Sequence, residues 1–334
     1  MKQIISCPIC GNKECKQIHK RKLVYPAGRL EDHLSDFDFV RNKILFDTIL
    51  RQETPIEFVF KICINCGFIF FSPRCEEEDY LVKFVEINRL GTDLIKEKVV
   101  YMRTYDDGKA HILYKRLSKI YNINNSIIID VGGAHGLYLK YFLPCNTCYV
   151  VDYVKYDLAK GVKYLCNSTE GVPESVKADI VLFCHTLEHV LDPVKEIKNI
   201  IKLLKPGGLL YIEVPPGCWQ QEYKHIGSFI THINFFSEGS LWHLLDVCGL
   251  KIKYLKLKPL IGRIRYEPII MAIAEKSTVE NQKVNGYQIT SKHMKGRHIL
   301  LRTYTNLLSL RLMKLKYFVW IFRKIKMALL RNNY

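Results

Sequence analysis

The sequence predicts an α/β fold in which helices cover both faces of a mostly parallel sheet. Short apolar runs with the length and β-branched content of buried strands recur at residues 127–129, 149–151, 180–183 and 209–212. An amphipathic, helix-like stretch at 194–204 separates the last two runs. The Lys-Pro-Gly-Gly sequence at 205–208 ends that helix, because proline interrupts a helix and glycine adopts the left-handed turn. Strands that alternate with helices indicate parallel pairing.

The remaining elements follow in order along the 334 residues, a length sufficient for two domains at about 150 residues each. We expect a cysteine-rich lobe at 1–78, a helical connector at 79–125, an α/β core at 126–275 and a basic, amphipathic helical tail at 276–334. The acidic run at 76–79 marks a helix start. Two strands, at 251–256 and 269–274, end the core.

Composition excludes several classes of protein. Apolar residues make up 48% of the chain and charged residues 25%, which is typical of a globular protein and excludes a mostly disordered one. The longest apolar run near the C-terminus, 317–322, is far shorter than a membrane-spanning helix. A Cys-x-x-Cys pair begins at Cys7, before the apolar core of a secretory signal could form. We therefore expect a cytoplasmic protein whose cysteines bind metal or are buried thiols.

The positive charge is concentrated in the tail. The net charge is +17, and residues 276–334 hold 13 Lys or Arg and a single acid, Glu280. The region 300–331 combines basic and aromatic residues, which suits a helix lying on the anionic inner face of a membrane. The alternative, of equal weight, is a helix that packs on the body or on a second copy in a homo-oligomer. Nucleic acid is a weaker candidate partner, because no base-reading motif accompanies the charge.

Two Cys-x-x-Cys-Gly sequences predict a metal site in the lobe. Their thiols belong to Cys7, Cys10, Cys63 and Cys66. Two such pairs form a tetrahedral zinc site, and a shell of four thiolates leaves no open position for chemistry. We therefore expect a structural zinc ion, with buried or free thiols as the alternative. A third pair, Cys145 and Cys148, lacks the glycine and is better interpreted as buried thiols.

A glycine-containing turn follows the first strand of the core. The strand ends at Asp130, the glycines are Gly132, Gly133 and Gly136, and a helix is expected to begin after them. Neither the dinucleotide fingerprint nor a phosphate loop is present, so the turn suits a ligand with a cationic or hydroxyl-bearing face. The next strand ends at Asp152, where an acid can accept both hydroxyls of a ribose. An ordinary α/β domain with acids at its strand ends is the alternative.

These motifs resemble those of the class I S-adenosylmethionine-dependent methyltransferases over roughly residues 100–275. The resemblance rests on the Asp130–Gly136 turn, Asp152, the Leu-Glu-His turn within 178–193 and the helix end and strand at 203–215. Only Ala134, where glycine is commoner, departs from the first motif. The resemblance implies a Rossmann-like, doubly wound, seven-stranded sheet and S-adenosylmethionine as cofactor. The implied cofactor-binding residues are Asp130, Gly132, Gly133, Gly136, Asp152, Tyr153, Cys184 and His185.

The cysteine lobe sharpens this resemblance. A zinc knuckle, the apolar strand and Pro-Arg of residues 66–74, then helices and a methyltransferase core, are similar to a bacterial subgroup that includes the sugar-nucleotide C-methyltransferases. Related enzymes act in surface-glycan and natural-product pathways. The resemblance implies O- or C-methylation of a sugar or nucleotide-sugar. A basic tail stands where the C-methyltransferases carry a further α/β domain.

The catalytic base is expected in the loop before the helix that starts near Glu238. The sugar C-methyltransferases have a His-Glu-His segment here whose last histidine is the proposed base, and His232 resembles it, with Thr231 in place of the glutamate. Histidine suits proton transfer at neutral pH. We expect substrate contacts from Tyr223 and His225 in the same loop. The alternative role for His232 is to pack and order the loop.

Parts of the sequence also suggest two other functions. An RNA methyltransferase is suggested by zinc knuckles and positive charge, but the charge lies in the tail and residues 214–217 lack the Pro-Pro-Tyr motif of base-methylating enzymes. A non-catalytic scaffold that binds a membrane or partner chain is suggested by the departures at Ala134 and Thr231. The intact acids and glycines of the expected cofactor site argue against the scaffold.

Overall fold

The computed structural model describes residues 1–24, 46, 50, 55–79, 81–82, 85, 108–217, 232–261, 266–276 and 285–292. Tyr223 and His225 lie outside these residues, as does the tail beyond residue 292. The roles expected for both side chains, and the helix expected in the tail, therefore stay predictions.

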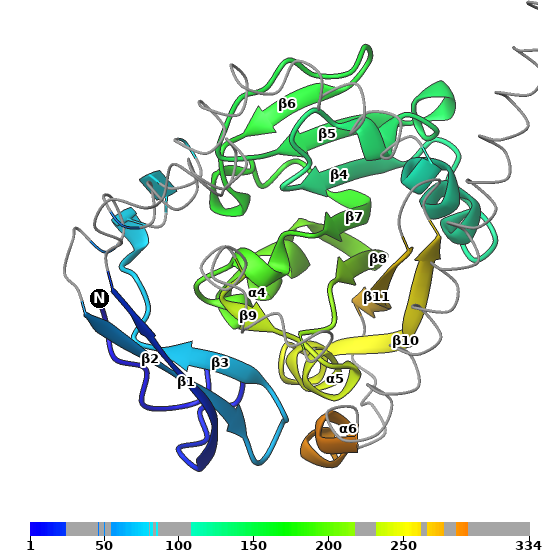
Figure 1. Cartoon of the computed structure of the whole chain (residues 1–334). Helices are drawn as coiled ribbons and strands as arrows, with labels where there is room; N and C mark the ends of the chain where they lie inside the picture. Colours follow the sequence, from blue (N-terminus) through cyan, green and yellow to red (C-terminus); the bar gives the residue numbers. More distant parts are fainter. Residues whose placement is uncertain are drawn as a thin grey trace, which may run out of the picture. The chain divides into compact units, whose positions relative to one another are not determined.

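A seven-stranded sheet forms the core (Figure 1). Its strands, in spatial order, are β10 (Leu250–Ile261), β11 (Tyr266–Lys276), β8 (Leu204–Val214), β7 (Ala178–Cys184), β4 (Ile127–Val131), β5 (Thr147–Val151) and β6 (Lys163–Cys166). All neighbours from β8 to β6 pair in parallel, whereas β11 is antiparallel to both β8 and β10. This topology confirms the predicted mostly parallel, doubly wound fold, because the order reverses direction at β4.

The helices of the core begin at strong capping residues. Helix α4 (Pro193–Leu203) has Asp192 as N-cap, and the Asp192 carboxylate accepts a hydrogen bond from the Lys195 N–H at 2.9 Å. Helix α5 (Glu238–Val247) starts at a capping box in which Ser237 and Ser240 exchange hydrogen bonds. Residues 108–117 are also helical, and α6 (Gly286–Lys292) is a short final helix. The helix predicted at 194–204 is thus confirmed.

The helix expected after the glycine turn does not form. Residues 132–146 contain two three-residue 3₁₀ turns, η2 (Leu137–Leu139) and η3 (Leu143–Cys145). Pro144 lies in the first turn of η3 and provides no N–H to continue a helix from η2.

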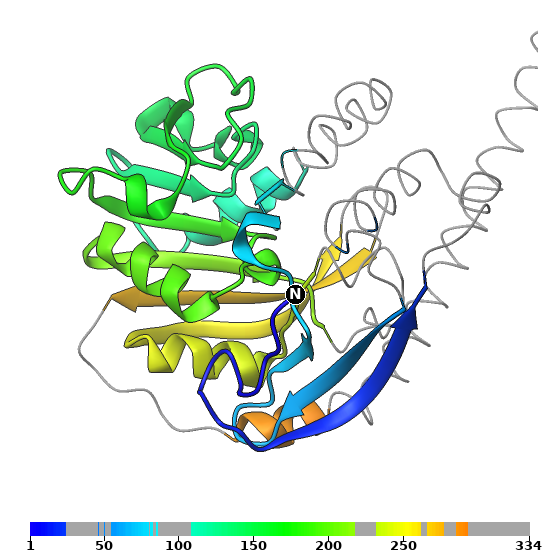
Figure 2. The same ribbon diagram turned by 90° about the vertical axis from the view of Figure 1, so that its left-hand side faces the viewer.

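The N-terminal lobe contributes three strands to a second, four-stranded sheet. These are β1 (Cys15–Leu23), β2 (Ile56–Cys63) and β3 (Ile69–Ser72). The fourth strand, β9 (Asn234–Phe235), comes from the segment between β8 and α5, and it pairs with β3 through Ile69 and Phe70. Figure 1 shows β9 beside β3, and Figure 2 shows the antiparallel strands β1 and β2 side by side, with one end of the pair near α6. A strand of the core segment therefore completes the sheet of the lobe.

One buried cluster continues from the lobe into the core. Phe68 and Phe70 are fully buried in the same cluster as Phe183 and Leu241, and the rings of Phe68 and Phe236 lie 5.2 Å apart. Burying one such aromatic side chain stabilises the fold by about 2–3 kcal/mol. The lobe is therefore held against the core by apolar packing as well as by the β3–β9 pairing.

Among the described helices, none is long and apolar enough to cross a membrane.

Candidate active site and cysteine cluster

The glycine turn lies at the carboxyl end of β4, between the ends of β5 and β7. The Gly132 N–H donates to the Val151 carbonyl at 2.8 Å, and Gly132 has a φ of 72°. A Cβ on Gly132 would lie 2.3 Å from Oγ1 of Thr186, and one on Gly133 would lie 2.6 Å from the Asp130 carboxylate. Both positions therefore require glycine, for conformation at Gly132 and for space at both.

Ala134 stands where the first motif more commonly has glycine, and its backbone adopts a conformation that favours glycine. Its φ is 46°, in the left-handed region where glycine is favoured. Its N–H donates to Oδ2 of Asp152 at 2.9 Å. The turn therefore keeps a glycine-like backbone although Ala134 has a methyl side chain. The Ala134 N–H connects the glycine turn that follows Asp130 to the carboxylate of Asp152.

Asp130 is a buried carboxyl group beneath the turn. Its side chain is 1% exposed, and Oδ2 has no hydrogen-bond partner among the described residues. Burial raises the pKa of Asp130 to about 8, and the negative charge of Asp152 contributes to the same shift. A cationic or hydrogen-bond-donating ligand group beside it would relieve the burial of this carboxyl.

Asp152 is half-buried at the end of β5. Its two carboxylate oxygens accept hydrogen bonds from the backbone N–H groups of Ala134 and Val154, at 2.9 and 3.0 Å. Burial raises its pKa, although these two hydrogen bonds act in the opposite direction. Each carboxylate oxygen keeps a further lone pair, so the fixed carboxylate can still accept ligand hydroxyls. Tyr153 follows with 54% of its surface exposed.

Two of the expected residues, Cys184 and His185, lie at the end of β7, and the His185 side chain keeps 27% of its surface exposed. Cys184 is buried, and burial raises the pKa of its thiol well above the ordinary value. His185 has a left-handed φ of 53°, and its backbone N–H donates to the Glu213 carbonyl at 2.8 Å. Burial lowers the pKa of His185 to about 3, so its ring is neutral at pH 7. The next residue, Thr186, borders the glycine turn, because a Cβ on Gly132 would lie 2.3 Å from its Oγ1.

His232 lies against the next turn of the same strand end. The turn η5 (Leu187–His189) carries Glu188 and His189. The ring centroids of His189 and His232 are 4.8 Å apart, and Nε2 of His189 is 3.9 Å from Oε1 of Glu188. The ligand atoms of Glu188, His189 and His232 all lie within 4.8 Å of one another. The structure thus groups the expected base with two residues that the sequence places more than 40 positions earlier.

The backbone around His232 is pinned by residues that the sequence did not single out for this role. The Ile233 N–H donates to the Glu188 carbonyl at 2.9 Å. The Asn234 side-chain amide donates to the carbonyls of Leu187 and Val190, at 3.0 and 2.6 Å. The buried guanidinium of Arg74 donates to the Ile233 carbonyl at 2.9 Å. Of these residues, only Arg74 carried a sequence signal, as the end of the Pro-Arg motif that follows the second Cys-x-x-Cys pair within the lobe.

Glu213, at the end of β8, is a further buried acid beside His185. Its side chain is 3% exposed and accepts hydrogen bonds from Tyr211 and Arg116. Burial raises the pKa of Glu213, while the hydrogen bond from Tyr211 and the charge of Arg116 oppose that shift. Its Oε2 lies 3.8 Å from Nε2 of His185. The only signal in the sequence that could have identified Glu213 is the presence of an acidic residue directly after the apolar run at 209–212.

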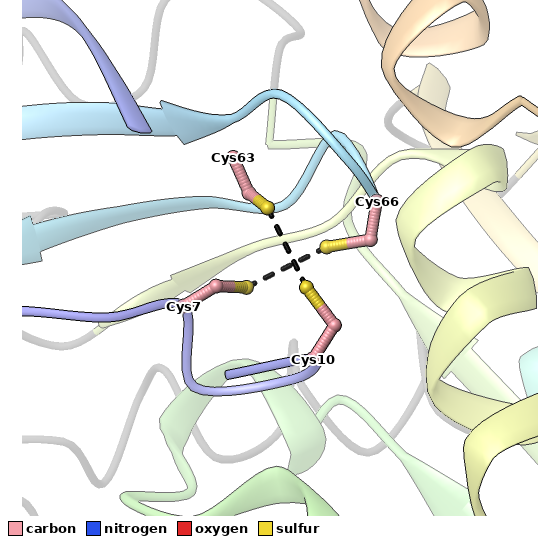
Figure 3. Close-up of side chains that lie close together, drawn as sticks. All are labelled: Cys7, Cys10, Cys63 and Cys66. Atoms are coloured by element: carbon pink, nitrogen blue, oxygen red, sulfur yellow. Dashed lines mark hydrogen bonds between the residues drawn. The ribbon is translucent and has the colours of Figure 1, made fainter. Parts of the chain in front are cut away.

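The four knuckle cysteines converge on one point (Figure 3). Sγ of Cys7 lies 3.5 Å from Sγ of Cys66, and Sγ of Cys10 lies 3.5 Å from Sγ of Cys63. Zinc–sulfur bonds of about 2.3 Å place the sulfurs of a tetrahedral site about 3.8 Å apart. The arrangement of these four residues, hereafter the Cys cluster, therefore fits a tetrahedral metal ion.

The backbone of each knuckle supports the same interpretation. Gly11 and Gly67 have φ values of 70° and 74°, and their N–H groups donate to the carbonyls of Cys7 and Cys63. A Cβ on Gly67 would lie 2.3 Å from Oγ1 of Thr290 in α6, so the second knuckle is closely covered. In the third pair, Cys148 is buried as predicted, but Cys145 is exposed and that part of the prediction is wrong, because Cys145 ends the surface turn η3.

Comparison with known proteins agrees with this geometry. Residues 102–255 match a protein-family model described as a methyltransferase domain. No curated protein is similar enough to this chain to count as a match. The sheet topology confirms the predicted fold class, and the family model supports a methyltransferase domain over residues 102–255.

Solved structures with a similar fold share little sequence with this chain. A methyltransferase from Methanosarcina mazei is 19% identical, covering 49% of this chain and 97% of its own, with a TM-score of 0.40. The 1,6-didemethyltoxoflavin-N1-methyltransferase of Burkholderia thailandensis, solved with S-adenosylhomocysteine, is 18% identical over 64% of this chain and 98% of its own, with a TM-score of 0.45. An Aquifex aeolicus methyltransferase is 17% identical over 53% and 92%, with a TM-score of 0.39.

Proposed function

We propose that this chain uses S-adenosylmethionine to methylate an oxygen or carbon atom of a sugar or nucleotide-sugar, in surface-glycan or natural-product biosynthesis. The observation that carries the cofactor assignment is the pair of carboxyl groups at neighbouring strand ends. Asp130 and Asp152 are joined by the glycine turn, through the hydrogen bond from Ala134 to Asp152. The sugar acceptor is supported by the resemblance of the cysteine lobe and core to the sugar-methylating subgroup.

Each cofactor-binding residue has a proposed role that its position supports. Asp152 accepts the ribose hydroxyls on a carboxylate that two backbone N–H groups already hold in place. Gly132, Gly133 and Gly136 form the surface over which the methionine part passes, and Asp130 supports it from below. Tyr153, Cys184 and His185 complete the proposed wall at the ends of β5 and β7. When bound, S-adenosylmethionine supplies an electrophilic methyl group.

On the acceptor side, His232 is the proposed general base. Its ring lies against His189 at the carboxyl end of the parallel strands, the edge at which α/β folds bind their ligands. Tyr223 and His225 remain the proposed substrate contacts. Alignment of the acceptor with the methyl group, together with removal of its proton, is the main task of such a site.

The Cys cluster is proposed to hold a structural zinc ion, because its four thiols fit a closed tetrahedral shell. For the tail, the proposals are peripheral binding of residues 300–331 to the anionic inner face of the membrane, or packing on the body or on a second copy. A cytoplasmic location is proposed together with either interaction.

Calorimetric titration of the zinc-replete protein with S-adenosylmethionine and S-adenosylhomocysteine tests the cofactor assignment. We expect micromolar binding that Asp152→Ala weakens at least about tenfold, since it removes a charged hydrogen-bond acceptor. Asp157→Ala, which removes an exposed carboxylate from the same loop, is the matched control and should bind normally. If the folded wild-type protein binds neither ligand, the proposed function is wrong. If it binds, nucleotide-sugars can be screened for methyl transfer.

A further inference from the structure

We propose that Glu188, His189 and His232 bind a divalent first-row transition-metal ion that holds and activates hydroxyl groups of the acceptor. This site is separate from the Cys cluster, and its role on the acceptor rests on the proposed function. Among the described residues, these are the second group whose ligand atoms lie close enough to share one ion. A site of one carboxylate and two imidazoles leaves coordination positions open, in contrast to the closed shell of four thiols.

The spacing of the three side chains fits a common ion. Two ligands of one ion at bond lengths of about 2.1 Å lie at most about 4.2 Å apart. Oε1 of Glu188 and Nε2 of His189 are already 3.9 Å apart, and no ligand atom of the three is more than 4.8 Å from another. Small side-chain rotations bring all three within range. The rings of His189 and His232 are inclined by 70°, so their nitrogen lone pairs can approach a point from different directions.

The backbone holds these side chains together before any ion binds. Glu188 and His189 share one turn, and the Ile233 N–H fixes the neighbour of His232 to the Glu188 carbonyl at 2.9 Å. The Asn234 amide ties the same segment to the two ends of that turn. These hydrogen bonds fix the backbone that carries the three side chains, so the proposed site is held together without the ion.

Charge also favours a cation at this point. The Glu188 side chain is 1% exposed, and a buried carboxylate requires compensating positive charge or strong hydrogen bonds. The two imidazoles favour ions such as Zn²⁺ or Co²⁺ over Mg²⁺, and the carboxylate also makes the site suitable for Mn²⁺.

The metal site gives His232 a different task from that of a general base, because a ring nitrogen bound to an ion cannot accept a proton. The ion itself would lower the pKa of a bound hydroxyl group and fix its oxygen. Open positions on one ion are well suited to two adjacent hydroxyls, so the inference narrows the acceptor to a molecule with a vicinal diol, as sugars have. The proton would leave to solvent, and the remaining oxygen would form a bond to the methyl carbon as the S–CH₃ bond of S-adenosylmethionine breaks and S-adenosylhomocysteine leaves.

Electron paramagnetic resonance of Mn²⁺ tests the site without relying on activity. Aqueous Mn²⁺ is titrated into protein whose Cys cluster is already filled with zinc, and binding is followed by the loss of the free-ion signal. We expect one bound Mn²⁺ per chain, and at least about tenfold weaker binding in Glu188→Gln, His189→Gln and His232→Gln. His19→Gln, a change on β1, is the control and should bind as the wild type does.

S-adenosylhomocysteine binding and thermal unfolding are measured on each variant to show that it is folded and retains the cofactor site. Failure of the wild-type protein to bind Mn²⁺, while it binds S-adenosylhomocysteine, would overturn the metal site and leave His232 as the proposed base. Equal Mn²⁺ affinity in wild type and all three variants would also overturn it. Failure to bind S-adenosylhomocysteine, with Mn²⁺ bound, would instead refute the proposed function.

Discussion

Gly132→Ala provides the sharpest test of the glycine turn, because the structure separates two reasons for glycine at this position. The first is conformational: φ is 72°, and a left-handed residue other than glycine costs about 1–2 kcal/mol. The second is steric: the new Cβ would lie 2.3 Å from Oγ1 and 2.7 Å from Cγ2 of Thr186. Overpacking of this kind typically costs about 1–3 kcal/mol. Together they predict a loss of about 2–5 kcal/mol of unfolding free energy.

Two companion variants separate these contributions. Gly249→Ala places the same methyl group at a φ of 75°, where a Cβ would meet nothing within 4 Å, so it measures the conformational part alone. Thr186→Ala removes the two atoms that collide with the methyl group on Gly132. It also removes the hydroxyl that donates to the carbonyls of Val131 and Cys184, at a cost of about 1 kcal/mol.

Urea denaturation is measured on the wild-type protein, on these three variants and on the double variant Gly132→Ala/Thr186→Ala. The double variant completes the double-mutant cycle, which measures the coupling free energy between positions 132 and 186. We expect the double variant to be more stable than the sum of the single changes by about 1–3 kcal/mol, because the collision exists only when both side chains are present. Strict additivity would refute the proposed contact between the turn and the end of β7. A loss in Gly132→Ala no larger than that in Gly249→Ala would refute the steric argument.

Four further predictions can be checked with the same preparations. Ala134→Gly relieves the left-handed strain and keeps the N–H that Asp152 accepts, so urea denaturation should show a change between zero and a gain of about 1 kcal/mol; a clear loss contradicts this. The folded-state pKa of Asp130, about 8, lies above its ordinary value of about 3.9, so the native state binds more protons between these pH values. Unfolding free energy should therefore fall as pH rises through that window, by up to several kcal/mol, and Asp130→Asn should flatten the profile; an unchanged slope refutes the assignment. Arg74→Met leaves the buried Ile233 carbonyl without its charged donor, so it should lower the unfolding free energy by about 2–4 kcal/mol and weaken Mn²⁺ binding. Normal Mn²⁺ affinity in this variant would show that Arg74 does not position His232. A strong chelator should remove zinc from the Cys cluster and lower the melting temperature, and a metal-free protein that melts at the same temperature would exclude a structural ion.

Local patterns predicted the strands of the core well. The runs at 127–129, 149–151, 180–183 and 209–212 lie within four parallel strands, because the strands of a parallel sheet are buried on both faces and are apolar throughout. The terminal strand pair was also found, although β10 and β11 extend beyond the predicted bounds. The acids and glycines of the proposed cofactor site lie together at one sheet edge, since parallel strands bring their carboxyl ends to the same side.

Other elements depend on contacts that sequence periodicity does not record. Strand β6 is only half-buried at the edge of the sheet, so Lys163–Cys166 lacks the apolar run that identified its neighbours. The two-residue strand β9 has no period at all, and it exists because β3 pairs with it from about 160 positions earlier in the chain. The grouping of Glu188, His189 and His232 has the same origin, because it requires the segment before β9 to be fixed against η5.

Contacts with the cysteine lobe help to position the residues of the proposed acceptor site. The Cys cluster fixes the turn between β2 and β3, and β3 pairs with Asn234, two residues after His232. Arg74, two residues after β3 ends, donates to the Ile233 carbonyl, next to the same histidine. Two connections therefore run from the lobe to the residues beside His232, one through the sheet and one through a buried guanidinium. The ion proposed for the Cys cluster would in this way help to determine the position of His232 without itself taking part in the proposed reaction.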